Sequence, residues 1–211
     1  MIKLIIFDLD GTLVDAYRAI YKSLNFTLRK LGYRQASFAA SRRAVGWGDK
    51  ALVAKFVKDK DVDKARSSYR AHHKKALLRY ARVLPGAKKV LNILKERKIK
   101  LAIASNRPQK FTNILVKHLK LKKYFDIIAC AKDKHEFKPN PYLLLKIIKK
   151  MKVKKTEAIY VGDMAVDVYA GKNAGIKMVA VLGGSSPIKE IKMAGPHKHI
   201  AKISDLLEAL R

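Results

Sequence analysis

Two aspartates, Asp8 and Asp10, follow directly after the apolar run Leu4–Phe7 at the beginning of the sequence. The run predicts a short buried strand, which ends at the turn-prone pair Asp10-Gly11. Carboxylates this close together repel one another unless a cation lies between them. Carboxylate oxygens suit Mg²⁺, an ion that keeps several waters and bridges to phosphate groups, so the pair predicts a magnesium site. Gly11 would let the backbone turn closely around a small anion.

A second pair of carboxylates, Asp163 and Asp167, comes after the apolar run Ala158–Val161 and Gly162. This run also predicts a buried strand. In an open parallel sheet, ligands bind beyond the carboxyl ends of the strands. Both pairs of aspartates therefore occupy the position in which such a sheet places its ligands.

Polar residues end two further segments of the chain. Ser105 and Asn106 follow the apolar run Leu101–Ala104 at the start of a predicted helix, where backbone N–H groups and a hydroxyl suit phosphate oxygens. Lys138 lies in a loop ahead of a helix predicted over 141–151. Each of these signals is weak alone, but their order and their common place at strand ends make the set specific.

Strands alternate with helices over most of the chain, a pattern typical of a parallel sheet covered by helices on both faces. We therefore predict an α/β fold with a Rossmann-like core. After the first strand, the expected elements are helix 87–97, strand 101–104, helix 108–119, strand 126–130, helix 141–151, strand 158–161, helix 165–174, strand 177–181 and helix 204–210.

The segment 16–81 breaks this alternation, because it carries helical patterns and no β-rich run. Its first helix should end at Gly32, and a second break falls at Gly46-Trp47-Gly48. The segment follows the first strand, so it must leave the sheet and return to it. We expect an all-helical cap domain over 16–81, inserted into a core domain made of 1–15 and 82–211.

The motifs together resemble those of the haloacid dehalogenase superfamily. Asp8–Thr12 matches its first motif, Ser105 its second, Lys138 its third and Gly162–Asp167 its fourth. The strings around the first and fourth motifs, and the helical insert after the first, are similar to the phosphoglycolate phosphatase and β-phosphoglucomutase branch. The resemblance spans nearly the whole chain and implies a phosphohydrolase with a helical cap.

The resemblance also implies roles for the matching residues. Asp8 would attack phosphorus and become an aspartyl-phosphate, and Asp10 would protonate the leaving oxygen and later activate water. The magnesium ligands would be Asp8, Asp10 (through its carbonyl), Asp163 and Asp167. The phosphoryl oxygens would be bound by Thr12, Ser105, Asn106 and Lys138.

In the expected cap, this branch often keeps substrate-contacting residues near the glycine break. Arg43, Trp47 and Lys50 flank that break and are the candidates for substrate specificity. The basic character of this stretch, with Arg42, Arg43 and Lys50 against Asp49, favours an anionic group on the substrate beyond its phosphate. A solvated or packing role is the alternative for each of the three.

The composition adds an unusual charge, since 47 Lys and Arg face 17 Asp and Glu for a formal net charge of +30. Such a charge attracts polyanions, so a nucleic-acid-binding protein or a phosphatase for nucleic-acid ends stays open. The basic residues are spread along the chain, however, with no basic tail. The apolar runs are too short to span a membrane, and the single Cys130 excludes an internal disulfide, so we expect a cytoplasmic monomer or homodimer.

The predicted activity is therefore Mg²⁺-dependent hydrolysis of a small phosphorylated metabolite, such as phosphoglycolate or a sugar phosphate. A phosphosugar mutase would use the same two residues, Asp8 and Asp10, and the sequence does not separate the two reactions. Dehalogenation is disfavoured, because dehalogenases of this superfamily lack the second aspartate of the first motif.

Overall fold

The computed structural model describes residues 1–211 and contains a six-stranded parallel sheet in the order β5-β4-β1-β6-β7-β8. The alternation of strands and helices predicted this class of fold, and the prediction is confirmed. The strands are β1 (Leu4–Phe7), β4 (Lys100–Ser105), β5 (Ile127–Cys130), β6 (Ala158–Gly162), β7 (Lys177–Val181) and β8 (Lys198–Ile200).

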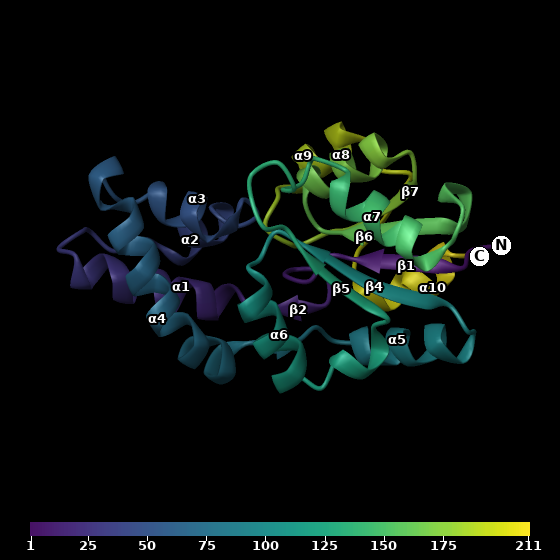
Figure 1. The fold of residues 1–211 in the computed structure, drawn as a ribbon, viewed down its shortest axis with the longest axis horizontal. Coiled ribbons are helices and arrows are strands. Elements are labelled where there is room, and N and C mark those ends of the chain that lie inside the picture. The colour runs from purple at the N-terminus through teal and green to yellow at the C-terminus, as the bar shows by residue number, and fades with distance from the viewer.

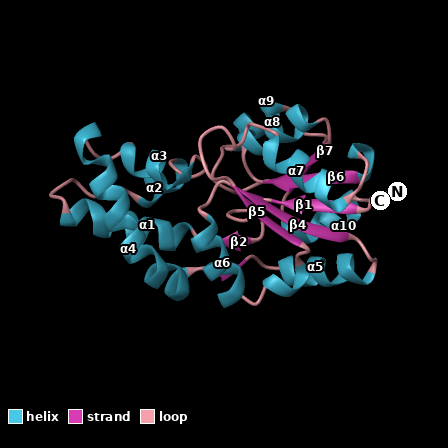
Figure 2. Ribbon diagram, in the orientation of Figure 1, coloured by secondary structure: helices cyan, strands magenta, loops and turns pink.

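Helices cover both faces of the sheet (Figures 1 and 2). The side chains of β1 alternate between the faces, as a strand requires. Ile5 and Phe7 pack into an apolar cluster with α5 (Ala87–Glu96) and α6 (Gln109–His118). Leu4 and Ile6 pack on the other face, against α7 (Tyr142–Met151) and α8 (Ala165–Ala174). Burial on both faces explains why β1 is a continuous apolar run.

A helical insert leaves the sheet after β1 and extends to one side of it (Figure 1). It joins the rest of the chain through an antiparallel pair, β2 (Val14–Asp15) with β3 (Arg82–Val83), in which Val14 pairs with Val83. An apolar cluster of ten buried residues lies within the insert. Its helices are α1 (Tyr17–Lys30), α2 (Phe38–Arg43), α3 (Gly48–Ala54) and α4 (Val62–Tyr80).

The end of the chain differs from the prediction. After β7 the structure adds helix α9 (Ile188–Ala194) and the edge strand β8, neither of which was predicted. The strand β8 has only three residues, and two of them are exposed. A short polar edge strand carries no apolar run, so periodicity does not reveal it. The last helix, α10 (Leu206–Ala209), is shorter than the expected 204–210.

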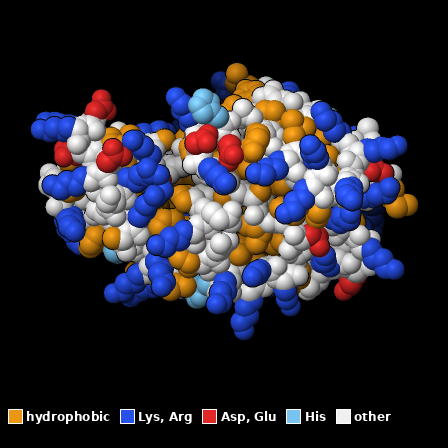
Figure 3. Space-filling view, viewed as in Figure 1, with side chains coloured by type: hydrophobic (Ala, Val, Ile, Leu, Met, Phe, Trp, Pro, Cys, Tyr) orange, Lys and Arg blue, Asp and Glu red, His pale blue; other side chains and the backbone are white.

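The charged residues are spread over the visible face of the molecule, where Lys and Arg dot both the insert and the sheet domain (Figure 3). None of the helices is both long enough and apolar enough to cross a bilayer.

Candidate active site

The predicted strand ends meet at the edge of the sheet that faces the insert. Asp8 follows β1, Ser105 ends β4, and Asp163 follows β6. Because β1 lies between β4 and β6, these three residues come from adjacent strands. All three are buried, as is Lys138 from the loop between β5 and α7.

Three carboxylates of this group form an acidic cluster. One oxygen each from Asp8, Asp163 and Asp167 lie within 4.8 Å of one another. The Nζ of Lys138 donates to Asp8 Oδ1 at 2.6 Å and to Asp167 Oδ1 at 2.7 Å. It also donates to the hydroxyl of Tyr160 at 3.0 Å, and that hydroxyl donates to Asp167 Oδ1. A single buried ammonium thus serves two carboxylates.

The charge in this cluster is not balanced by Lys138 alone. Burial raises the pKa of Asp8 to about 7, even though Lys138 acts in the opposite direction. Burial and the charges of Asp167 and Asp8 raise the pKa of Asp163 well above its usual range. Carboxylates whose ionised forms are destabilised in this way gain from a further cation. The three clustered oxygen donors fit a hard divalent metal such as Mg²⁺.

Hydrogen bonds fix the carboxylate of Asp163 within the cluster. Its Oδ1 accepts from the hydroxyl of Thr12 at 3.1 Å, and its Oδ2 accepts from the hydroxyl of Tyr17 at 3.2 Å and the backbone N–H of Ser185 at 3.0 Å. Gly11 must stay small here, since a Cβ at this position would lie 2.3 Å from Asp163 Oδ2. Thr12, predicted to bind phosphate, directs its hydroxyl to Asp163.

The residue after Ser105 ties the core to the insert. Asn106 accepts from the backbone N–H of Lys138 at 3.0 Å and donates through Nδ2 to the carbonyl of Gly46 at 2.8 Å. Gly46 has φ of +115°, and a Cβ there would come within 2.5 Å of Met164. The absence of a side chain at Gly46 therefore lets the insert approach the edge of the sheet closely.

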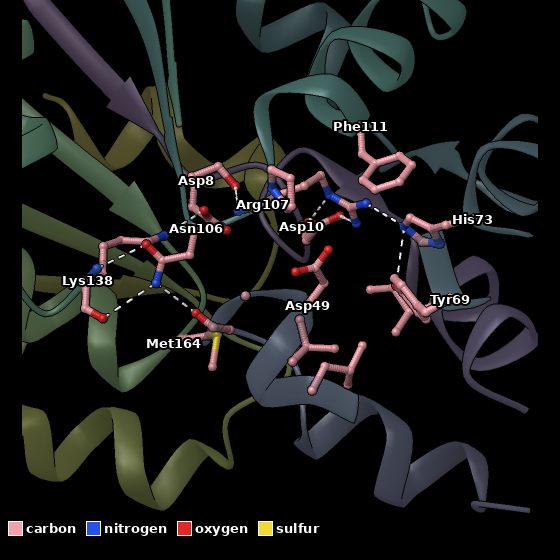
Figure 4. Close-up of a pocket in the computed structure, with 17 residues that line it drawn as sticks. Asp8, Asp10, Asp49, Tyr69, His73, Asn106, Arg107, Phe111, Lys138 and Met164 are labelled. Atoms are coloured by element: carbon pink, nitrogen blue, oxygen red, sulfur yellow. Dashed lines mark hydrogen bonds and ion pairs between the residues drawn. The ribbon is translucent and has the colours of Figure 1, made fainter. Parts of the chain in front are cut away.

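Asp10 makes a buried ion pair with Arg107, which follows the Ser105-Asn106 pair. Arg107 donates from Nε to Oδ2 and from Nη2 to Oδ1, both at 2.8 Å, so both oxygens of Asp10 are engaged. Its third nitrogen, Nη1, lies 2.8 Å from Nε2 of His73 on α4. Arg107 therefore connects the core to the insert (Figure 4).

Part of this group lines one pocket between the core and the insert, which we call the central pocket (Figure 4), whereas Asp163 and Asp167 are not among its lining residues. The core contributes Asp8, Asp10, Ser105, Asn106, Arg107, Pro108, Phe111, Lys138 and Met164, and the insert contributes Ile20, Val45, Gly46, Gly48, Asp49, Leu52, Tyr69 and His73. The volume of this cavity is about 60 Å³. The space suits a small ligand.

The chain matches the haloacid dehalogenase-like hydrolase family over residues 5–181. It belongs to this family. A phosphoglycolate phosphatase of Aquifex aeolicus (strain VF5) is 31% identical over 207 residues, which cover 96% of this chain and 97% of the relative. A protein of Caldanaerobacter subterraneus subsp. tengcongensis, provisionally named pyrophosphatase PpaX, is 30% identical over 214 residues and covers 100% of this chain and 95% of its own.

Solved structures share the fold over the whole chain. A predicted phosphoglycolate phosphatase from Haemophilus somnus 129pt has a TM-score of 0.93 at 24% identity and covers 100% of this chain and 98% of its own. The family and the relatives identify this haloacid dehalogenase-like hydrolase as an enzyme that hydrolyses phosphoric monoesters. The resemblance drawn from the sequence motifs is confirmed.

The structure of this hydrolase does not bring all predicted residues into the central pocket. Lys50 is exposed and pairs with Asp63 at 3.0 Å. Arg43 reaches Glu190 of α9 at 3.2 Å, and Trp47 lies with Arg43 in a separate groove at the border between insert and core. Their role in specificity stays a prediction. The pocket instead receives their neighbours Gly46, Gly48 and Asp49.

The roles of several site residues were not predicted from the sequence. Arg107 follows Ser105-Asn106 directly, so its place in the second motif was a usable signal. His73 and Tyr17 come from the insert and reach the site only through its packing on the core. Tyr160 occupies an apolar strand position that gives no sign of its bond to Asp167.

Proposed function

We propose that this hydrolase is a Mg²⁺-dependent phosphatase that cleaves a small phosphomonoester through a phosphorylated Asp8. The observation that carries the proposal is the hydrogen bonding of the two oxygens of the Asp8 carboxylate. Its Oδ1 is held by Lys138 at 2.6 Å, whereas its Oδ2 makes no hydrogen bond within the protein and Asp8 lines the central pocket. A carboxylate fixed by one oxygen and open at the other is suited to nucleophilic attack.

Attack by Asp8 Oδ2 on phosphorus forms an acyl phosphate, and the bond from phosphorus to the leaving oxygen breaks. Asp10 gives a proton to that oxygen and later takes one from the water that attacks the phosphorus of the intermediate. This releases inorganic phosphate and restores Asp8. Ser105, Asn106 and Lys138 line the same pocket and would bind the phosphoryl oxygens, on which negative charge is concentrated.

The metal would be held by Asp8, Asp163, Asp167 and the backbone carbonyl of Asp10. When bound, Mg²⁺ neutralises charge on the phosphoryl group and helps to orient it. The unbalanced charge of the acidic cluster supports this assignment. Thr12 and Tyr17 hold Asp163 in place, a supporting role that matters for the strength of metal binding.

The insert over 16–81 would act as a lid. Its link to the core through the short pair β2–β3 gives two chain crossings at which a hinge can bend. In the present arrangement the insert meets the core through Asn106, Arg107 and the carbonyls of Gly183 and Gly184, which accept from Arg42. Closure of this kind excludes bulk water while Asp8 is phosphorylated.

The substrate we favour is phosphoglycolate or a similar small acid. The small volume of the pocket and the name of the Aquifex aeolicus relative support this choice. A panel of phosphoglycolate, sugar phosphates, pyrophosphate and 5′-phosphorylated oligonucleotides, scored by phosphate release, tests it. Activity should vanish with chelator and return with Mg²⁺.

Two results would contradict the proposal: full activity in excess chelator, or no phosphate release from any member of the panel. Formation of an isomeric sugar phosphate without free phosphate would show the mutase reaction instead. Selective hydrolysis of the oligonucleotide ends, with binding that falls steeply as salt rises, would favour the nucleic-acid alternative.

A further inference from the structure

Arg107 carries a buried positive charge whose one anionic partner is Asp10. The side chain of Arg107 is 6% exposed, and its ion pair with Asp10 has both donor–acceptor distances at 2.8 Å. An arginine keeps its charge in proteins. A buried charge that loses its partner is strongly destabilising. Arg107 therefore needs an anion beside it throughout the reaction.

The histidine beside Arg107 does not provide that anion. Arginine only donates hydrogen bonds, so Nε2 of His73 must accept from Arg107 Nη1. The ring proton then lies on Nδ1, which is 3.0 Å from the hydroxyl of Ser23. Burial and the charge of Arg107 also lower the pKa of His73, which keeps the ring neutral.

The carboxylate that the insert places in the pocket is already engaged. Asp49 accepts from Nε of Arg66 at 3.1 Å and from both Nε and Nη2 of Arg70. Two arginines therefore already pair with its single charge. Asp10 has no substitute within the insert as the counter-ion of Arg107.

This ion pair is incompatible with the proposed role of Asp10 as the general acid and base. To serve the leaving oxygen, Asp10 must direct an oxygen toward the substrate, but both of its oxygens accept from Arg107. Opening the pair frees Asp10 and at the same time leaves Arg107 without an anion. An anion that enters the pocket with the substrate would replace Asp10 beside Arg107 and so remove this conflict.

We propose that Arg107 is the binding site for a second anionic group of the substrate, which takes the guanidinium from Asp10, so that Asp10 can take up a proton from water and give it to the leaving oxygen. The inference rests on the proposed function and narrows its substrate class. The substrates are small phosphomonoesters with a carboxylate or comparable anion close to the phosphate. A planar carboxylate can accept the two parallel hydrogen bonds that Nε and Nη2 of Arg107 now donate to Asp10. An ester without a second anionic group leaves Asp10 paired with Arg107, because it brings no anion that could replace Asp10.

The test compares 2-phosphoglycolate with its carboxamide analogue, which has nearly the same shape and lacks the second negative charge. We expect kcat/KM of the wild-type enzyme to favour the acid by about 100-fold, the order expected for a buried charge pair. In Arg107→Gln the preference should fall to within a few-fold, mainly through loss of activity on the acid. Arg107→Lys keeps the charge but loses the pair of parallel N–H donors, so its preference for the acid should be intermediate. Arg79→Gln, a change at an exposed arginine outside the pocket, should keep the wild-type preference.

The outcomes separate this inference from the proposed function. Equal kcat/KM for the two compounds in the wild-type enzyme would overturn the role of Arg107, although the enzyme would still be a phosphatase. Equal losses on both compounds in Arg107→Gln would also overturn it, since they would indicate a general structural role. A wild-type enzyme that hydrolyses neither compound nor any other ester would instead contradict the proposed function.

Discussion

The edge of the sheet and the helical insert provide the two walls of the central pocket, and their charged residues are organised differently. On the sheet side, Asp8, Asp163 and Asp167 form a cluster in which the ammonium of Lys138 binds Asp8 and Asp167, and the pKa of Asp8 rises to about 7. On the insert side, Asp49 alone receives two arginines. The sheet wall has fewer cationic side chains than carboxylates, whereas the insert wall has two arginines for the single carboxylate of Asp49.

This difference indicates that the sheet side of the pocket is suited to catalysis, whereas the charges on the insert side stabilise the structure of the insert. A cluster of under-compensated carboxylates costs stability, and such a cost is expected where a site must bind a cation and react. Paired charges such as those of Asp49 fix the position of α3 against α4, so they favour a definite lid surface. The following predictions test this contrast, beginning with the largest effect.

The largest effect should come from the nucleophile. Asp8→Asn removes the attacking carboxylate and should lower kcat by at least about 10⁴-fold, in the range found when nucleophiles are removed from other hydrolases. Asp49→Asn, the matched change on the insert, should cost far less. Steady-state kinetics on the best ester of the panel measures both. Near-normal turnover by Asp8→Asn would place the chemistry elsewhere.

A smaller loss is expected for the proton donor. Asp10→Asn keeps the shape of the side chain, but it removes the anion beside Arg107 and cannot transfer a proton, so kcat should fall by about 10² to 10⁴. Esters with good leaving groups need less protonation, so the loss should shrink for p-nitrophenyl phosphate. The same loss on every ester would argue against Asp10 as a general acid.

Stability should change in opposite directions on the two walls. Between about pH 4 and pH 7, the folded metal-free protein holds a proton on Asp8 that the unfolded chain has already released, so the free energy of unfolding falls as pH rises through this window. Asp8→Asn has no carboxyl group to ionise at this position, so its free energy of unfolding does not fall in this way. The variant should be more stable than the wild type at pH 8 in chelator, by roughly 1–3 kcal/mol.

Asp49→Asn should instead destabilise, by roughly 1–3 kcal/mol, because it takes the shared partner from Arg66 and Arg70. Urea unfolding at pH 5 and pH 8 measures both variants. Destabilisation of comparable size in the two, at both pH values, would remove the contrast between the walls.

The smallest effect concerns the residues predicted from the sequence to select the substrate. Lys50 is exposed and paired with Asp63, and it does not line the pocket. An exposed pair of this kind contributes little, so Lys50→Ala should change kcat/KM by less than about threefold on any ester. A reordering of the substrate panel by Lys50→Ala would show that the sequence-based prediction is right and that the insert moves further than its present position indicates.

The same contrast explains what could be predicted from the sequence. Asp8, Ser105 and Asp163 were predictable because each ends an apolar run, and the carboxyl ends of parallel strands meet at one edge. Lys138 was predictable only by its place in the order of motifs. The ion pair of Arg107 with Asp10 and its contact with His73 were not, because they depend on how the insert packs against the core. No local pattern encodes that approach.

The central claim is that Asp8 becomes phosphorylated, and trapping the intermediate tests it most directly. The enzyme is mixed with Mg²⁺ and excess substrate, quenched during turnover and reduced with borohydride, which converts an aspartyl-phosphate to homoserine. Mass spectrometry of the peptide that contains Asp8 should then show homoserine at position 8, and Asp10 should be unmodified. An unmodified Asp8 under turnover conditions, or reduction at another carboxylate, would contradict the account.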